Sequence, residues 1–224
     1  MLAAFFIEHL FEPQGQVYFA SVVLTVIVSI TLHELAHGWA ALWQGDDTPR
    51  RTGHMRADPL THMGGMSLLA LVLVGIAWGQ MPVNPSRFRH RYGHALVAAA
   101  GPLMNLLLAL FGLTILALWT RWGAPVDGGP EAWRRNLEVF LFTFGRMNFA
   151  LALFNLAPVP PLDGATVLSD LVPAYRRFLA GLRQPEMLFM IFLMVLFATS
   201  SAGTGLFDLA DAATRAYLDA WNFR

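Results

Sequence analysis

The stretch VYFASVVLTVIVSITLHELAHGWAALW, residues 17–43, sets the class of this protein. It is apolar for longer than the roughly 20 residues that a helix needs to cross a lipid bilayer. Three further stretches meet the same criterion, at residues 95–119, 139–158 and 187–207. We therefore predict an all-α membrane protein, a helical bundle of about four to six transmembrane segments. No internal repeat or long linker divides the chain, so residues 1–224 are expected to form a single domain.

The composition supports a membrane protein and excludes several classes of function. Hydrophobic residues make up 56% of the chain and charged residues only 13%, about half the charged share of a soluble domain. The net charge is zero and the basic residues, all arginine, are spread along the chain, so no basic stripe favours nucleic acid. The chain has no cysteine, which excludes disulfides and thiolate metal sites and leaves His, Asp and Glu as metal ligands.

The arginines predict how the chain is oriented in a cell membrane. Cytoplasmic loops carry an excess of basic residues. Arginines follow the first span and precede the second, which places both of these ends on the cytoplasmic side: Arg50, Arg51, Arg56, Arg87, Arg89 and Arg91. The apolar run at residues 66–79, only about 14 residues long, is too short for a crossing, and we expect it to enter the membrane and return.

The motif His33-Glu34-Leu35-Ala36-His37 lies near the cytoplasmic end of the first span. Histidines four residues apart on a helix share one face and can bind one zinc ion, while Glu34 stands where it can act on a zinc-bound water. The alternative is a chance match in which the histidines only pack or form hydrogen bonds. Ionisable groups within an apolar helix mark a functional site by default, which favours the metal site.

A third zinc ligand is expected from the sequence NLAPVPPLDG, residues 155–164. Its prolines cannot continue a helix, and non-helical backbone at membrane depth is tolerated only where it lines a cavity. The third span returns to the cytoplasmic side, so Asp163 arrives at about the level of His33 and His37. Taken alone, Asp163 before a glycine is more simply a helix cap or turn residue.

The sequence AGPLMN, residues 100–105, places small residues, a proline and Asn105 at the start of the second span. Small residues allow close helix packing, and Asn105 offers an uncharged hydrogen-bond donor inside the membrane. Asn105 could bind a substrate carbonyl or form a hydrogen bond between helices, and the sequence leaves both roles open.

These elements together resemble the site-2 protease family of intramembrane zinc metallopeptidases, in particular its short members without a PDZ domain. The likeness runs over residues 17–171 and includes GDDTP at 45–49, DPLTH at 58–62 and PVNP at 82–85. The sequence departs from the family pattern after His62, where MGG stands in place of an expected Asp-Pro. His62 itself is more simply a surface or interfacial histidine, and no histidine besides His33 and His37 is assigned to zinc.

The resemblance implies the roles of the site residues and the kind of substrate. His33, His37 and Asp163 would hold one catalytic Zn2+, Glu34 would be the catalytic base and acid, and Asn105 would contact the substrate or transition state. The substrates would be transmembrane or membrane-proximal proteins, cleaved near the cytoplasmic side of the cell membrane. The resemblance also implies a re-entrant or membrane-associated β-hairpin region between the first two spans.

Two other functions remain open at this point. A non-proteolytic membrane scaffold that binds zinc, or a divalent-metal transport protein, could use the same ligands. Glu34 discriminates against both, because three protein ligands leave one coordination position open and an acid/base group stands beside it.

Overall fold

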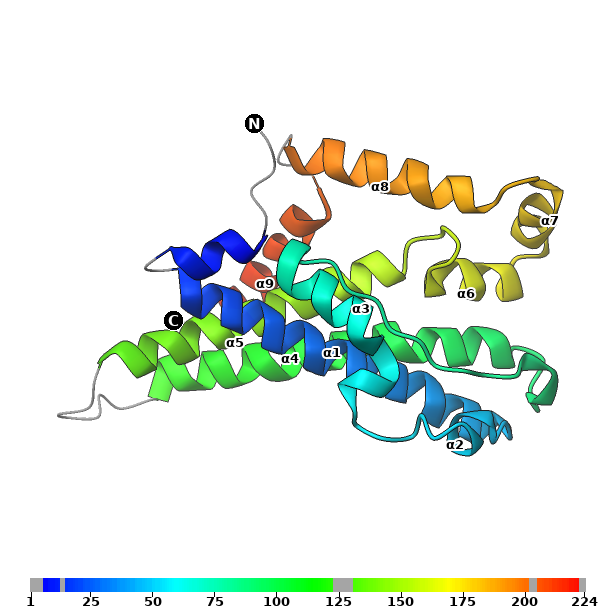
Figure 1. The fold of residues 1–224 in the computed structure, drawn as a ribbon, viewed down its shortest axis with the longest axis horizontal. Coiled ribbons are helices and arrows are strands. Elements are labelled where there is room, and N and C mark those ends of the chain that lie inside the picture. Colours follow the sequence, from blue (N-terminus) through cyan, green and yellow to red (C-terminus); the bar gives the residue numbers. More distant parts are fainter. Residues whose placement is uncertain (1–5, 13–14, 123–130, 202–204, 222–224) are drawn as a thin grey trace.

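Three long helices form the centre of the protein in a computed structural model that describes residues 6–12, 15–122, 131–201 and 205–221. They are α1 (Gly15–Gln44), α4 (Gly93–Trp122) and α5 (Glu131–Asn155), which lie side by side along the long axis (Figure 1). Each is long and apolar enough to span a membrane. At 1.5 Å per residue they measure roughly 37 to 45 Å, more than the hydrocarbon thickness of about 30 Å. The expected helical membrane bundle is confirmed.

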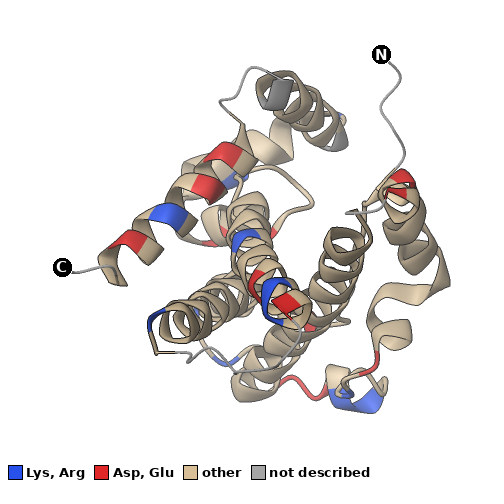
Figure 2. Cartoon of the chain, turned by 90° about the vertical axis from the view of Figure 1, so that its left-hand side faces the viewer, with Lys and Arg blue, Asp and Glu red and all other residues tan. Residues whose placement is uncertain are grey.

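The bundle is held together by small and apolar side chains. Ala109 and Leu113 of α4 are fully buried against Leu141 and Phe149 of α5, in a core that Ala210 also joins. Viewed from the end, the helices carry few charged residues (Figure 2). An apolar exterior around a close-packed interior is what lipid requires, because lipid gives no hydrophobic drive between helices and packing must supply the association.

Shorter helices surround this core. They are η1 (Phe6–Phe11), α2 (Thr48–Arg51), α3 (Pro59–Val74), η2 (Pro85–Arg87), α6 (Asp163–Leu171), α7 (Pro173–Gly181), α8 (Glu186–Ser201) and α9 (Leu206–Trp221). α9 packs on α4 and α5, where Thr114 and Tyr217 share a hydroxyl–hydroxyl bond of 2.7 Å and Arg146 pairs with Asp211. Arg146 thus finds a partner inside the protein rather than in lipid.

The predicted fourth span differs from the other three. The apolar residues 187–199 do form a helix within α8, but α8 has only 16 residues, roughly 24 Å. The predicted range 187–207 continues beyond α8 into α9, and residues 202–204 lie outside the described part of the chain. Of the described helices, only α1, α4 and α5 satisfy the length criterion, so the number of crossings stays a prediction.

The β-hairpin predicted between the first two spans is wrong. No strand occurs between residues 45 and 92, all of which the structure describes, and residues 59–74 form the helix α3. Asp58 caps α3 by accepting a hydrogen bond from the Leu60 amide, Pro59 occupies its first turn, and Gly75 ends it with a φ of 81°. These are ordinary start and stop signals of a helix, and they outweigh the resemblance.

After α3 the chain continues as an extended segment, residues 76–84, that crosses the face of α1. Ser67 of α3 bonds both backbone groups of Trp78, at 2.8 and 2.7 Å, and the Gln80 amide donates to the His62 carbonyl at 3.0 Å. The C-terminal end of this segment is anchored by the backbone N–H of Asn84, which donates to the carboxylate of buried Asp46 at 2.6 Å. α3 and the end of α1 therefore hold this segment in place.

Replacing Asp46 with alanine tests this anchor. The Asp46 carboxylate also accepts from the Thr48 amide at 3.0 Å and the Thr48 hydroxyl at 2.5 Å. We expect Asp46→Ala to destabilise the detergent-purified protein by about 2 kcal/mol, seen as a fall in Tm of roughly 4–8 °C. Asp47→Ala is the matched control, since Asp47 is half exposed and its ion pair with Arg87 lies at the surface, where such pairs contribute little.

The same anchor predicts a pH dependence. Burial raises the pKa of Asp46, but the hydrogen bonds from Asn84 and Thr48 outweigh this and hold that pKa below its usual value. A lowered pKa in the folded state gives stability that is present at neutral pH and lost as the pH falls through the folded-state pKa. The Tm difference between wild type and Asp46→Ala should therefore shrink below about pH 4; a difference that grows on acidification would contradict this account.

Candidate functional site

His33 and His37 lie one helical turn apart on α1 and face the interior of the bundle. Both are buried, and their Nε2 atoms are 3.0 Å apart. The i, i+4 spacing on an unbroken helix accounts for this geometry, as expected from the sequence.

Asp163 reaches the two histidines from the other side of the bundle. α5 ends at Asn155, and the proline-rich residues 156–162 carry the chain to α6, whose first residue is Asp163. Its Oδ2 lies 3.1 Å from Nε2 of His33, and its Oδ1 lies 3.4 Å from Nε2 of His37. Leu162, not Asp163, is the N-cap of α6, so the carboxylate is directed at the histidines rather than at its own helix.

The hydrogen bonds of the two rings indicate which nitrogen atoms are available to a metal. Nδ1 of His37 lies 2.7 Å from the Val97 carbonyl, which can only accept, so Nδ1 carries the hydrogen. Nδ1 of His33 lies 2.6 Å from Oδ1 of Asn105 and donates in the same way. In its neutral form each ring therefore presents an Nε2 lone pair toward the Asp163 carboxylate, and a cation between these groups would be bound by all three.

This donor set fits zinc. The described part of the chain holds one cluster of three His, Cys, Asp or Glu side chains whose ligand atoms all lie within 4.8 Å of one another, namely His33, His37 and Asp163. Two imidazole nitrogens and one carboxylate are the ligands of a catalytic zinc site, which leaves a further position open. The outer ring nitrogens are bonded to oxygen acceptors, as is usual around protein-bound zinc.

Glu34 lies beside this cluster and is also buried. His33, His37, Asp163 and His62 are the chargeable side chains that interact with it electrostatically. Its carboxylate forms no hydrogen bond with any residue that the structure describes, so its oxygen atoms are free to bind water or substrate.

His62 lies where the sequence did not predict it, whereas Asn105 forms the hydrogen bonds between helices that were one of its two expected roles. His62 was expected at the surface, but it is 1% exposed, and its Nε2 bonds the Arg56 carbonyl at 2.8 Å. Asn105 bonds His33 through its oxygen and Asn148 of α5 through its nitrogen, at 3.0 Å. The predicted contact between Asn105 and substrate stays a prediction.

The largest of these corrections has a simple cause. His62 lies in the first turn of α3, after the N-cap Asp58, and not in a hairpin. The buried residues of α3 are His62, Met63, Ser67 and Leu71, and Gly64, with a φ of 69°, kinks the helix between Met63 and Ser67.

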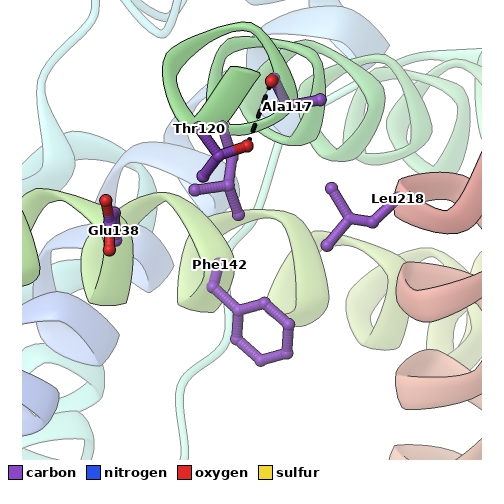
Figure 3. Close-up of a pocket in the computed structure, with 6 residues that line it drawn as sticks. Ala117, Thr120, Glu138, Phe142 and Leu218 are labelled. Carbon is purple, nitrogen blue, oxygen red and sulfur yellow. Dashed lines mark hydrogen bonds between the residues drawn. The ribbon is translucent and has the colours of Figure 1, made fainter. Parts of the chain in front are cut away.

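A cavity at the far end of the bundle is separate from this site. It has a volume of about 260 Å³ and is lined by Leu116, Ala117, Thr120, Glu138, Phe142 and Leu218 (Figure 3). Along α4, Leu116 lies roughly 22 Å from Gly101, which is next to the histidines. The cavity therefore has no part in the chemistry of the His33, His37 and Asp163 cluster.

Comparison with known proteins identifies the family. The model of peptidase family M50 matches residues 125–199. Over 192 residues the chain is 36% identical to YwhC of Bacillus subtilis (strain 168), which is named as a zinc metalloprotease, and the alignment covers 85% of each chain. The chain belongs to peptidase family M50.

Other relatives carry names of the same kind. This M50 protein is 31% identical over 186 residues to Rip2 of Mycobacterium tuberculosis (strain ATCC 25618 / H37Rv), covering 80% of this chain and 67% of Rip2. It is 32% identical over 149 residues to sll0528 of Synechocystis sp., covering 66% of this chain and 30% of the relative. Both are named as zinc metalloproteases. No solved structure matches the chain.

At two positions next to the site of this M50 protein, any side chain larger than that of glycine would clash with the site residues. A Cβ atom at Gly101 of α4 would lie 2.5 Å from Nε2 of His37 and in contact with Nε2 of His33. A Cβ atom at Gly79 of the extended segment would lie 2.5 Å from Oε1 of Glu34 and 2.6 Å from Cγ2 of Ile30. Gly101 thus makes space at the cluster of ligands, and Gly79 makes space beside the glutamate.

Alanine substitutions at these glycines should separate metal binding from catalysis. We expect Gly101→Ala to weaken zinc binding by at least about tenfold, because the methyl group displaces the ligand rings. Gly79→Ala should keep zinc but lose most activity, because it moves Glu34. Zinc titration with a competing chelator, run beside a cleavage assay, measures both effects.

The control is Gly181→Ala at the last residue of α7, because a Cβ atom there would meet nothing within 4 Å. If Gly101→Ala binds zinc as wild type does, the three ligands do not meet the metal where α4 approaches them.

Proposed function

We propose that this protein is an intramembrane zinc metalloprotease that hydrolyses peptide bonds of membrane-embedded or membrane-proximal proteins. In this proposal His33, His37 and Asp163 hold one zinc ion and Glu34 is the general base and acid. The observation that carries it is the convergence of two Nε2 atoms and one carboxylate in a buried site, beside a glutamate that forms no hydrogen bond with the described residues.

The chemistry needs little from the protein beyond these four residues. When bound, zinc supplies a Lewis acid that activates water and polarises the scissile carbonyl. Glu34 accepts the proton of the attacking water and returns it to the leaving amine, which a buried carboxylate next to the ligands is placed to do. The nucleophile is water, so no covalent acyl-enzyme forms on the chain.

The depth of the site supports cleavage near the cytoplasmic face. His33 precedes the end of α1 by 11 residues, from 33 to 44, which is about 16 Å along the helix. The loops at that end carry the arginines at positions 50, 51, 56, 87, 89 and 91. By the positive-inside rule this end faces the cytoplasm, so the site lies within the membrane but toward the cytoplasmic side.

The extended segment offers a place for substrate backbone. Trp78 and Gln80 use their amides toward α3, and successive residues of an extended chain point their amides to opposite sides. Ala77, Gly79 and Met81 form no backbone hydrogen bonds with the described residues, and Gly79 borders Glu34. A substrate unwound from its helix could pair with this edge, which would present its amide bond next to Glu34.

Replacing Glu34 with glutamine tests the proposal. We expect wild type, reconstituted in liposomes with a library of single-span transmembrane peptides, to give cleavage products identified by mass spectrometry. Glu34→Gln should lower the initial rate by at least about 10²–10⁴-fold, because the amide cannot accept the water proton. It should still bind about one zinc per chain.

The matched control is Glu138→Gln, since Glu138 pairs with Arg134 on α5 and lies far from the histidines. Cleavage by Glu34→Gln at the wild-type rate would remove Glu34 from the mechanism. Zinc binding by wild type with no cleavage of any peptide would favour the scaffold or metal-transport alternative.

A further inference from the structure

A series of hydrogen bonds between three buried side chains connects α5 to the candidate zinc ligand His33. Asn148 of α5 is fully buried, and its Nδ2 donates to the Phe144 carbonyl at 2.9 Å. Its Oδ1 accepts from Nδ2 of Asn105 at 3.0 Å, and Oδ1 of Asn105 accepts from Nδ1 of His33 at 2.6 Å. This hydrogen-bond series thus links three helices, from α5 through α4 to α1.

The donor and acceptor of every hydrogen bond in this series follow from the first bond, between Asn148 and the Phe144 carbonyl. A backbone carbonyl can only accept, so the amide nitrogen of Asn148 must face Phe144 and its oxygen must face Asn105. That oxygen in turn requires the nitrogen of Asn105, which leaves the oxygen of Asn105 toward His33. His33 must then carry a hydrogen on Nδ1, and the neutral ring keeps its Nε2 lone pair on the side of Asp163.

The two histidines differ in the group that holds the hydrogen on Nδ1. His37 donates to the Val97 carbonyl, which can only accept a hydrogen bond. His33 instead bonds a side-chain amide, which can rotate by half a turn and present a donor in place of an acceptor. An Asn105 turned in that way would place its NH2 against Nδ1 and favour the hydrogen on Nε2, where it blocks metal binding.

We propose that Asn148 is a positioning residue for the metal site: it holds the Asn105 amide in one orientation and thereby keeps Nε2 of His33 free for zinc. The inference rests on the proposed function, in which His33 is a ligand. Asn148 touches neither metal nor substrate in this scheme and acts only through Asn105.

The test measures the zinc dissociation constant by chelator competition in detergent. Asn148→Leu removes the acceptor at similar volume and should weaken zinc binding about 10- to 100-fold, the usual effect of losing an outer partner of a zinc ligand. If the leucine variant does not fold, Asn148→Ser takes its place in the test, because the serine side chain is too short to reach Asn105. Thr143→Val, a buried and near-isosteric change on the same helix with no link to Asn105, should bind zinc as wild type does.

A rescue variant separates positioning from a general packing role. Asn105→Asp presents oxygen on both branches, so it accepts from Nδ1 of His33 in either orientation and needs no anchor. The double variant Asn105→Asp, Asn148→Leu should therefore regain most of the affinity that Asn148→Leu loses. A packing defect at Asn148 would persist in the double variant, and that result would overturn the proposal.

The outcomes also separate this inference from the proposed function. If wild type binds zinc and His33→Ala and His37→Ala lose it, but Asn148→Leu and Asn148→Ser bind it like wild type, only the positioning role is wrong. If the two histidine variants bind zinc as tightly as wild type, the ligand assignment fails and the positioning role fails with it.

Discussion

The burial of polar groups in an apolar bundle is the constraint on which the rest of this structure depends. His33, Glu34 and His37 stand on a helix built to lie in lipid, where an unsatisfied polar group is costly. Each outer ring nitrogen has an oxygen acceptor, at Val97 and Asn105, and the inner nitrogens meet the Asp163 carboxylate. Within this site, the inner ring nitrogens, the Asp163 carboxylate and the Glu34 carboxylate are the groups that metal, water and substrate would use.

The other elements of the fold can be understood as ways to bring groups to α1. α4 approaches closely at Gly101, the proline-rich residues 156–162 end α5 early enough for Asp163 to enter, and α3 holds the extended segment against Glu34. Each requires an interruption of regular helix or a missing side chain at membrane depth. Such features are tolerated where they line a site, and here they surround one cluster.

Local patterns predicted the parts of the site that one helix or one chain break determines. The four-residue spacing of His33 and His37 is enough to place both rings on one face, and the proline break made Asp163 a candidate partner. The β-hairpin expected between the first two spans is wrong, because Asp58 and Pro59 start a helix there. The link from Asn148 to His33 depends on how three helices pack, which no local pattern contains.

X-ray absorption at the zinc edge of the purified protein tests the central claim most directly, because it reports the ligands themselves. The account predicts two imidazole nitrogens at about 2.0–2.1 Å, with the remaining shell made of oxygen at about 2.0–2.2 Å. Replacing Asp163 with alanine should remove the metal or change the oxygen shell while both imidazoles remain. A spectrum with three or more imidazoles, or one that the loss of Asp163 leaves unchanged, would contradict the account.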